Sequence, residues 1–259
     1  MSAAEEMVII LTGASRGIGL TIAHHILSQP AQHKVVVTAR TASALQDLQT
    51  KYGASRVEIL ASDASSPSFG ASLVRAAHTR FGRLDSIIIN HGSLDPVAKV
   101  GDTTAEQWRD AYATNVFSAV DLIRAALPSL RETRGRVVVT SSGAATGAYQ
   151  GWAAYGSGKA VLNHVVASLG VEEADVVSVS VRPGVVDTEM QRAIREEHKN
   201  AMSASDQAKF HGLHSEGKLV RPEQPGGVIA NLALRGERAL SGKFLSWDDE
   251  SLRGYRTDL

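Results

Sequence analysis

Tyr155 and Lys159 stand four residues apart in a segment with helical spacing, so their side chains share one face of the expected helix. A free phenol has a pKa near ~10 and exchanges protons poorly at neutral pH, but a neighbouring ammonium favours the ionised phenol and lowers that pKa. Such a pair can protonate a carbonyl oxygen. The same spacing also arises where a tyrosine packs in the core and a lysine extends its stem along the surface.

A serine and an asparagine are candidates to complete such a site. Ser142 follows a predicted strand and precedes Tyr155 by 13 residues, a separation that can return a strand end to the start of a helix. Its hydroxyl can hold a substrate oxygen, or it can serve a turn or a cap. Asn115 lies in an apolar helical segment, where a buried amide must find hydrogen-bond partners. We therefore expect Asn115 to belong to a hydrogen-bond network.

A glycine-rich turn near the start of the chain indicates a nucleotide site. It follows the first β-branched run, opens a helical segment and reads Thr12-Gly13-Ala14-Ser15-Arg16-Gly17-Ile18-Gly19. Small residues let the backbone approach a pyrophosphate, and the helix N-terminus favours its negative charge. The spacing is GxxxGxG rather than GxGxxG, and glycines also serve ordinary turns. The strand before the turn and the helix after it favour the dinucleotide interpretation.

Two arginines bear on which dinucleotide is bound. Arg40 ends the second predicted strand, where an NAD-binding protein usually carries an acidic residue for the ribose 2′-hydroxyl. Arg16 lies in the glycine turn. Two guanidinium groups can bind a 2′-phosphate in a bidentate manner, although both arginines can also be solvated surface residues. The pair favours NADP(H) over NAD(H).

Further polar residues follow the third and fourth predicted strands. Asp63 can accept a hydrogen bond from an adenine amino group, or it can be a turn or cap residue. Asn90-His91-Gly92 offers either a turn or a floor for the cofactor ribose. Both positions face the crevice in which sheets of this kind bind ligands.

Composition narrows the partners. The 259 residues contain 27 basic and 27 acidic residues and no cysteine, which argues against a nucleic-acid or anionic-membrane partner and excludes disulfides and thiolate chemistry. No apolar stretch reaches the roughly 18 residues of a membrane span, and the acidic first residues do not resemble a signal peptide. The pairs His24-His25 and His211-x-x-His214 lack further ligands, so no metal is expected. We expect a cytoplasmic protein with a small-molecule ligand.

Short β-branched runs alternate with longer helical segments, which predicts an α/β fold: a doubly wound parallel sheet of seven strands in the order 3-2-1-4-5-6-7, forming a single domain over 1–259. The predicted strands are Val8 to Leu11, Lys34 to Thr38, Val57 to Leu60, Ser86 to Ile89, Arg136 to Thr140, Val176 to Val181 and Lys243 to Trp247. The predicted helices include Ile18 to Leu27, Ala42 to Tyr52, Ser68 to Phe81, Ala105 to Leu130 and a late one near Gly227 to Leu234. Gly53, Gly82, Gly135 and Gly170 are expected close after helical segments, as end caps. The polar segment of about 188–221 is interpreted as a mobile lid.

The order and spacing of these motifs resemble the classical short-chain dehydrogenase/reductases over nearly the whole chain. The matching motifs are the glycine turn, Asp63, Asn90-His91-Gly92, Asn115, Ser142, Tyr155-Gly156-Ser157-Gly158-Lys159 and Pro183-Gly184-Val185-Val186-Asp187-Thr188. The sequence is most similar to the sepiapterin reductase and fungal benzil-reductase-like branch, through Tyr149-Gln150-Gly151-Trp152 and Pro183 to Gln191. It departs from the usual motif at His91, where alanine is common, and at Gly158, where serine or another small residue is usual.

The resemblance implies a catalytic tetrad of Asn115, Ser142, Tyr155 and Lys159 that reduces a ketone or vicinal diketone with NADPH. It implies cofactor contacts from Gly13, Ser15, Arg16, Gly17, Ile18, Gly19, Arg40, Asp63, Ala64, Asn90, Gly92, Tyr155, Lys159, Pro183, Gly184, Val186 and Thr188. Tyr149, Trp152 and Met190 are expected to line the substrate pocket, although the two aromatic residues can equally be core or dimer contacts. A homodimer or homotetramer is expected. The alternatives are an alcohol dehydrogenase working oxidatively and a non-catalytic NADPH-binding sensor.

Overall fold

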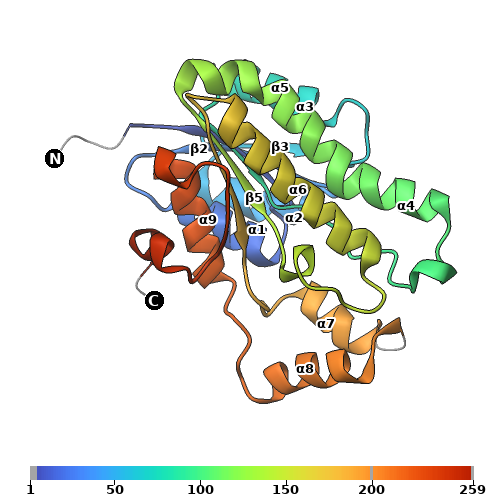
Figure 1. Cartoon of the computed structure of the whole chain (residues 1–259). Helices are drawn as coiled ribbons and strands as arrows, with labels where there is room; N and C mark the ends of the chain where they lie inside the picture. Colours follow the sequence, from blue (N-terminus) through green and yellow to red (C-terminus); the bar gives the residue numbers. More distant parts are fainter. Residues whose placement is uncertain (1–4, 199–200, 258–259) are drawn as a thin grey trace.

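Seven strands form one parallel sheet in the order β3-β2-β1-β4-β5-β6-β7 in a computed structural model that describes residues 5–198 and 201–257 (Figure 1). The predicted fold class and strand order are confirmed. The strands are β1 (Val8–Thr12), β2 (Lys34–Ala39), β3 (Val57–Ala61), β4 (Ser86–Ile89), β5 (Arg136–Thr140), β6 (Val177–Arg182) and β7 (Lys243–Ser246). Every bound lies within one residue of its prediction, because fully buried parallel strands are continuous apolar runs.

Helices cover both faces of the sheet (Figure 1). One face packs against α3 (Phe69–Phe81), α5 (Ser118–Thr133) and α6 (Ala153–Glu172), and the other against α1 (Gly17–Leu27), α2 (Ser43–Tyr52) and α9 (Glu223–Arg235). Each face carries its own apolar cluster, since alternate strand residues point to opposite sides. The helices on both faces support the sheet, in which the carboxyl ends of the parallel central strands lie together at one end.

The helix expected over 105–130 is interrupted. It consists of α4 (Ala105–Tyr112), a π-helical turn (Ala113–Phe117) and α5, which continues to Thr133. The Ser118 N–H bonds to the carbonyl of Ala113 rather than to that of Thr114. One wide turn changes the position of the next residues without changing the apolar pattern, so the periodicity did not predict it.

Two of the glycines expected at helix ends behave differently. Gly82 ends α3 in the left-handed conformation, with φ of 77°. Gly170 lies inside α6, which continues to Glu172, so that expectation was wrong. A Cβ on Gly170 would come within 2.6 Å of the Cα of Gly242, so this glycine permits a close approach between the helix and the turn before β7.

The segment expected to form a lid contains α7 (Glu189–Glu196) and α8 (Ala204–Ser215), which lie near the carboxyl ends of the central strands (Figure 1). Its two ends meet: Val220 N–H donates to Val185 O at 2.9 Å, and Asp187 N–H donates to Val220 O at 2.9 Å. Residues 199–200 of the segment lie outside the described residues, and its mobility stays a prediction. Among the described helices, none combines the length and apolar character that a membrane span requires.

Candidate active site

A cleft of about 820 Å³ lies at the carboxyl ends of the central strands and under α7 and α8. It is lined by every predicted site residue except Gly19 and Asn115. These two lie behind the lining, where Gly19 packs against the Gly13 backbone and Asn115 beside Gly92. The glycine turn and the helix that carries Tyr155 therefore share one cavity.

Tyr155 and Lys159 line this cleft from the first turns of α6 and are 8% and 3% exposed. The Lys159 Nζ lies 5.8 Å from the centre of the Tyr155 ring and donates a hydrogen bond of 2.8 Å to Thr140 O at the end of β5. Gly156 allows the approach of α6 to the strand end, since a Cβ there would come within 2.7 Å of Ala144 O. The lysine is thus fixed by the sheet and directed toward the tyrosine.

Burial dominates the acid–base properties of this pair. Burial raises the pKa of Tyr155 above its ordinary value, and the Ser142 hydroxyl opposes this by stabilising the ionised form. Burial, rather than the expected effect of the Lys159 charge, therefore determines the direction of the Tyr155 pKa shift. Burial also lowers the pKa of Lys159 to about 8. The phenol therefore stays protonated at neutral pH, which is the form that can donate a proton.

Ser142 lines the cleft, whereas Asn115 lies behind its lining. The Ser142 Oγ accepts a hydrogen bond from Ala144 N–H at 3.1 Å, so the serine caps a short turn while lining the cleft. Asn115 is 2% exposed within the π-helical turn. Its Oδ1 accepts from Ser93 N–H at 2.8 Å and its Nδ2 donates to Ser93 O at 2.9 Å. The predicted hydrogen-bond network around Asn115 is present.

Gly158 explains one departure from the usual motif. A Cβ on Gly158 would come within 3.3 Å of Val116 Cγ2 and 3.8 Å of Asn115 Cβ. The glycine costs α6 about 1 kcal/mol relative to alanine. In return, the helix packs closely on the π-helical turn that carries Asn115.

The glycine turn has the geometry of an anion-binding cradle. Gly13 and Gly17 have φ of 66° and 53°, and a Cβ on Gly19 would lie 2.0 Å from Gly13 O. The N-terminus of α1 has no side-chain cap and no acidic residue in its first turn. Its N–H groups thus remain available for a negatively charged ligand.

Arg16 and Arg40 are exposed at the rim of the cleft, and neither guanidinium group forms a hydrogen bond with another residue in the described part of the chain. Asp63 lies near Arg40 and accepts two hydrogen bonds of 2.8 Å from Ser65, one from its N–H and one from its hydroxyl. These bonds lower the pKa of Asp63, with the Arg40 charge adding a smaller effect. The turn interpretation of Asp63 is confirmed, while an adenine contact stays a prediction.

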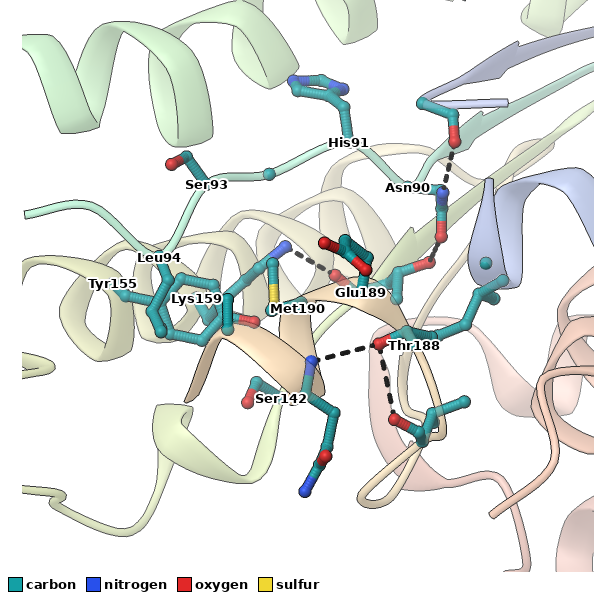
Figure 2. Close-up of a pocket in the computed structure, with 18 of the residues that line it drawn as sticks. Asn90, His91, Ser93, Leu94, Ser142, Tyr155, Lys159, Thr188, Glu189 and Met190 are labelled. Carbon is teal, nitrogen blue, oxygen red and sulfur yellow. Dashed lines mark hydrogen bonds between the residues drawn. The ribbon is translucent and has the colours of Figure 1, made fainter. Parts of the chain in front are cut away.

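A chain of hydrogen bonds joins the two ends of the cleft (Figure 2). Asn90 Nδ2 donates to Gly13 O at 3.1 Å, and Asn90 Oδ1 accepts from Thr140 Oγ1 at 3.1 Å. Because Thr140 O accepts from Lys159, the glycine turn is linked to the lysine through one asparagine and one threonine. Gly92 permits this proximity: its Cβ would lie 3.2 Å from Asn115 Oδ1 and 3.5 Å from the Lys159 Nζ.

The segment after β6 closes the cofactor side of the cleft. Gly184 has φ of 81°, a conformation that favours glycine. Thr188 caps α7 by accepting from Gln191 N–H at 3.4 Å, and a Cβ on Gly17 would lie 3.1 Å from its methyl group. Pro183 and Val186 line the same wall. This segment therefore faces the start of α1 across the cleft.

Three aromatic rings, those of Tyr149, Trp152 and Phe210, form an aromatic wall of the cleft, and Phe210 was not among the predicted site residues. The ring centres of Tyr149 and Trp152 lie 4.8 Å apart, and Phe210 of α8 stacks on Trp152 at 5.4 Å. Lys209 donates a hydrogen bond of 2.8 Å to the Tyr149 hydroxyl. Met190 packs against the same cluster. The sequence does single out Phe210, because it is the one phenylalanine, tyrosine or tryptophan in 188–221, the segment expected to cover the substrate.

Residues 7–199 match the family model for short chain dehydrogenases. A benzil reductase ((S)-benzoin forming) of Saccharomyces cerevisiae is 37% identical over 95% of this chain and 97% of its own length. An uncharacterized oxidoreductase of Schizosaccharomyces pombe is 39% identical over 95% of this chain and 98% of its own length. The crystal structure of the S. cerevisiae short chain dehydrogenase/reductase YIR035C covers 97% of this chain and 100% of its own, with a TM-score of 0.94 and 38% identity.

Proposed function

Since this chain belongs to the short-chain dehydrogenase family and is an oxidoreductase of its fungal benzil-reductase-like branch, we propose that it reduces a ketone or vicinal diketone to the alcohol with NADPH. The observation that carries the proposal is the shared cleft. In it a protonated Tyr155 lies beside Ser142 and close to Lys159, and the glycine turn lines the same cavity. An aromatic wall in the same cleft suits a substrate with aryl substituents.

The proposed acid chemistry uses three side chains of the cleft. Ser142 donates a hydrogen bond to the carbonyl oxygen and fixes its position. Tyr155 transfers the proton of its hydroxyl to that oxygen as negative charge develops on it. The buried Lys159 ammonium stabilises the phenolate that remains, and its bond to Thr140 O keeps it in place. Asn115 holds the loop at Ser93, which keeps the floor of the cleft rigid.

The cofactor residues fit a dinucleotide phosphate. The uncapped α1 N-terminus leaves N–H groups for a pyrophosphate, and the lack of a side chain at Gly19 lets the start of the helix pack tightly against Gly13. Arg16 and Arg40 would hold the 2′-phosphate, while Pro183, Gly184, Val186 and Thr188 would line the nicotinamide pocket. When bound, NADPH supplies the hydride that adds to the carbonyl carbon.

Cofactor choice is the first test. Removing both guanidinium groups with Arg16→Ser and Arg40→Ser should weaken NADPH binding by about 10- to 100-fold, because each loses a charge-assisted bond to phosphate. NADH binding should change less than threefold. Arg253→Ser, an exposed arginine outside the cleft, is the control and should change neither affinity. A wild-type preference for NADH over NADPH in steady-state rates would contradict the proposal.

Activity on carbonyls is the second test. NADPH consumption with a panel of aliphatic ketones, aryl ketones and benzil should be fastest with the aryl diketone. A protein that binds NADPH but reduces no member of the panel would favour a sensor role. A protein that oxidises alcohols with NADP⁺ faster than it reduces the matching carbonyls, at neutral pH, would favour an oxidative dehydrogenase.

We also propose a cytoplasmic homo-oligomer, either a dimer or a tetramer. Phe117 and Val120, at the junction of the π-helical turn and α5, are 59% and 41% exposed, and Val171 near the end of α6 is 88% exposed. Large apolar side chains on neighbouring surface helices are typical of subunit interfaces. Light scattering coupled to gel filtration should give twice or four times 27.5 kDa. A monomer at micromolar concentration would contradict this proposal.

A further inference from the structure

His91 stands in the loop that follows β4 and is one of the residues that line the cleft. Figure 2 shows the ring pointing away from Tyr155 and Lys159. It packs edge to face against Phe69, with ring centres 5.5 Å apart, and Phe69 is 2% exposed.

The hydrogen bonds of His91 assign its protonation. Nε2 lies 3.1 Å from Thr114 O, which can only accept, so Nε2 carries the hydrogen. Nδ1 is then the acceptor and lies 2.7 Å from the hydroxyl of Thr12, closer than the other acceptor within reach of that hydroxyl, Ile88 O at 3.3 Å. Ser118 Oγ lies 2.8 Å from Nε2 and itself donates to Thr114 O at 2.6 Å. A neutral imidazole satisfies all of these contacts.

One partner of His91 is a carbonyl that the π-helical turn leaves without its usual bond. In an α-helix the Ser118 N–H would donate to Thr114 O, but here it donates to Ala113 O. Thr114 O instead receives the Ser118 hydroxyl and the His91 Nε2–H. Asn115 is the next residue in this turn, so the imidazole stabilises the backbone geometry that presents Asn115.

The other partner of His91 belongs to the nucleotide side. Thr12 ends β1, directly before Gly13, and its hydroxyl oxygen also accepts from Asn90 N–H at 3.0 Å. Gly13 lies so close to the loop that a Cβ on it would come within 2.9 Å of the His91 Cα. His91 therefore spans the distance between the glycine turn and the π-helical turn.

We propose that His91 is a positioning residue, which fixes the Asn115 turn relative to the Gly13 turn and thereby aligns cofactor and carbonyl for hydride transfer. The proposal rests on the proposed reductase function. The His91 ring points away from Tyr155 and Lys159 (Figure 2), and its role is exerted through Thr12 and Thr114.

The test compares His91→Ala with His91→Gln. The glutamine Nε2 can still donate to Thr114 O, whereas alanine removes this donor. His91→Ala should slow hydride transfer to benzil about tenfold in single-turnover experiments, with KM for benzil within twofold, and should raise the Kd for NADPH three- to fivefold. His91→Gln should recover the transfer rate to within threefold of wild type.

The matched control is His33→Ala. His33 is 4% exposed, accepts a hydrogen bond from Met7 N–H and lies at the opposite, amino edge of the sheet. It should lower the melting temperature without changing the transfer rate. A His91→Ala rate within twofold of wild type, or an equal loss of rate in His33→Ala, would overturn the inference. A wild-type protein that reduces no carbonyl would sink the reductase proposal, and an unchanged Kd for NADPH in His91→Ala would then still overturn the role of His91.

Discussion

The two walls of the cleft are held by different forces. The wall formed by the strand ends and α6 is held by buried hydrogen bonds that run from Gly13 through Asn90 and Thr140 to Lys159. The wall formed by α7 and α8 is held by ring contacts around Trp152 and by the backbone bonds at Val220. The first kind of contact fixes atoms to a fraction of an ångström, whereas the second tolerates changes in side-chain shape.

This difference separates chemistry from substrate choice. A proton donor must lie at one distance from the carbonyl oxygen, so the residues that hold Tyr155 belong to the rigid wall. A pocket for an apolar substituent needs shape and apolar surface, which three rings from two separate segments can supply. Changes in the first wall should therefore affect the rate of the chemical step, and changes in the second should affect substrate preference.

The largest effect is expected from the charged residue of the rigid wall. Lys159→Met should lower kcat for carbonyl reduction about 10³-fold, because it removes the charge that stabilises the phenolate and opens the hydrogen-bond chain at Thr140. Steady-state NADPH oxidation gives the rate. Lys218→Met, an exposed lysine outside the cleft, should retain wild-type kcat. A loss of less than tenfold in Lys159→Met would remove the distinction between the walls.

Acid should weaken the rigid wall through His91. Burial lowers the pKa of His91 to about 4, with the Lys159 charge adding to the effect, against 6.5 in the unfolded chain. Between these values the unfolded chain binds a proton that the folded chain excludes, so stability is present above pH 6.5 and is lost as the pH falls toward 4. From pH 7 to pH 5 this group should lower the free energy of unfolding by about 2 kcal/mol.

Urea unfolding of wild type and His91→Gln at both pH values isolates this contribution, since all other titrating groups are shared. The variant should lose about 2 kcal/mol less than wild type over the same interval. Parallel losses in the two proteins would mean that the imidazole is already charged in the folded state, and its hydrogen-bond assignment would be wrong.

A smaller effect is expected from the aromatic wall. Phe210→Ala should raise KM for benzil about tenfold, because one stacked ring contact is worth about 1 kcal/mol and the exposed gap adds to the loss. KM for a small aliphatic diketone should change less than twofold. Phe210→Leu, which keeps most of the volume, should fall between. Equal losses on both substrates would show that Phe210 supports the whole cleft rather than the aryl substituent.

The smallest effect is expected from alkaline pH. Burial lowers the pKa of Lys159 to about 8, so the ammonium loses its proton as the pH rises through that value. The kcat/KM for reduction, which reports the free enzyme, should therefore fall about fourfold between pH 7 and pH 8.5. A profile that is flat to pH 9 would place the lysine pKa higher and reduce the weight of burial at the rigid wall.

The sequence alone predicted the strands of the sheet and most of the residues that form the rigid wall. Continuous apolar runs in buried strands have few alternative interpretations, and glycine, tyrosine and lysine at fixed spacing constrain where a ligand can approach. The buried Asn115 followed from the need of an amide for partners, and its bonds to Ser93 confirm that reasoning.

The remaining features depend on contacts between segments that are distant in sequence. The π-helical turn at Ala113–Phe117 leaves the apolar pattern unchanged, and its carbonyl partner His91 comes from another loop. Gly170 was predicted at a helix end because the residue it packs against, Gly242, lies 72 positions later in the sequence. The pKa of Tyr155 was expected to follow the lysine charge, but burial controls it, and burial becomes visible once the fold is built.

The most direct measurement concerns Tyr155 itself. Tyr155→Phe removes one oxygen and retains the ring, so NADPH binding, followed by protein fluorescence, should stay within twofold of wild type. Reduction of benzil, followed by NADPH oxidation, should fall at least 10²-fold, because the phenyl ring has no proton to give. A Tyr155→Phe protein that keeps more than a tenth of the wild-type rate would contradict the assignment of Tyr155 as the acid.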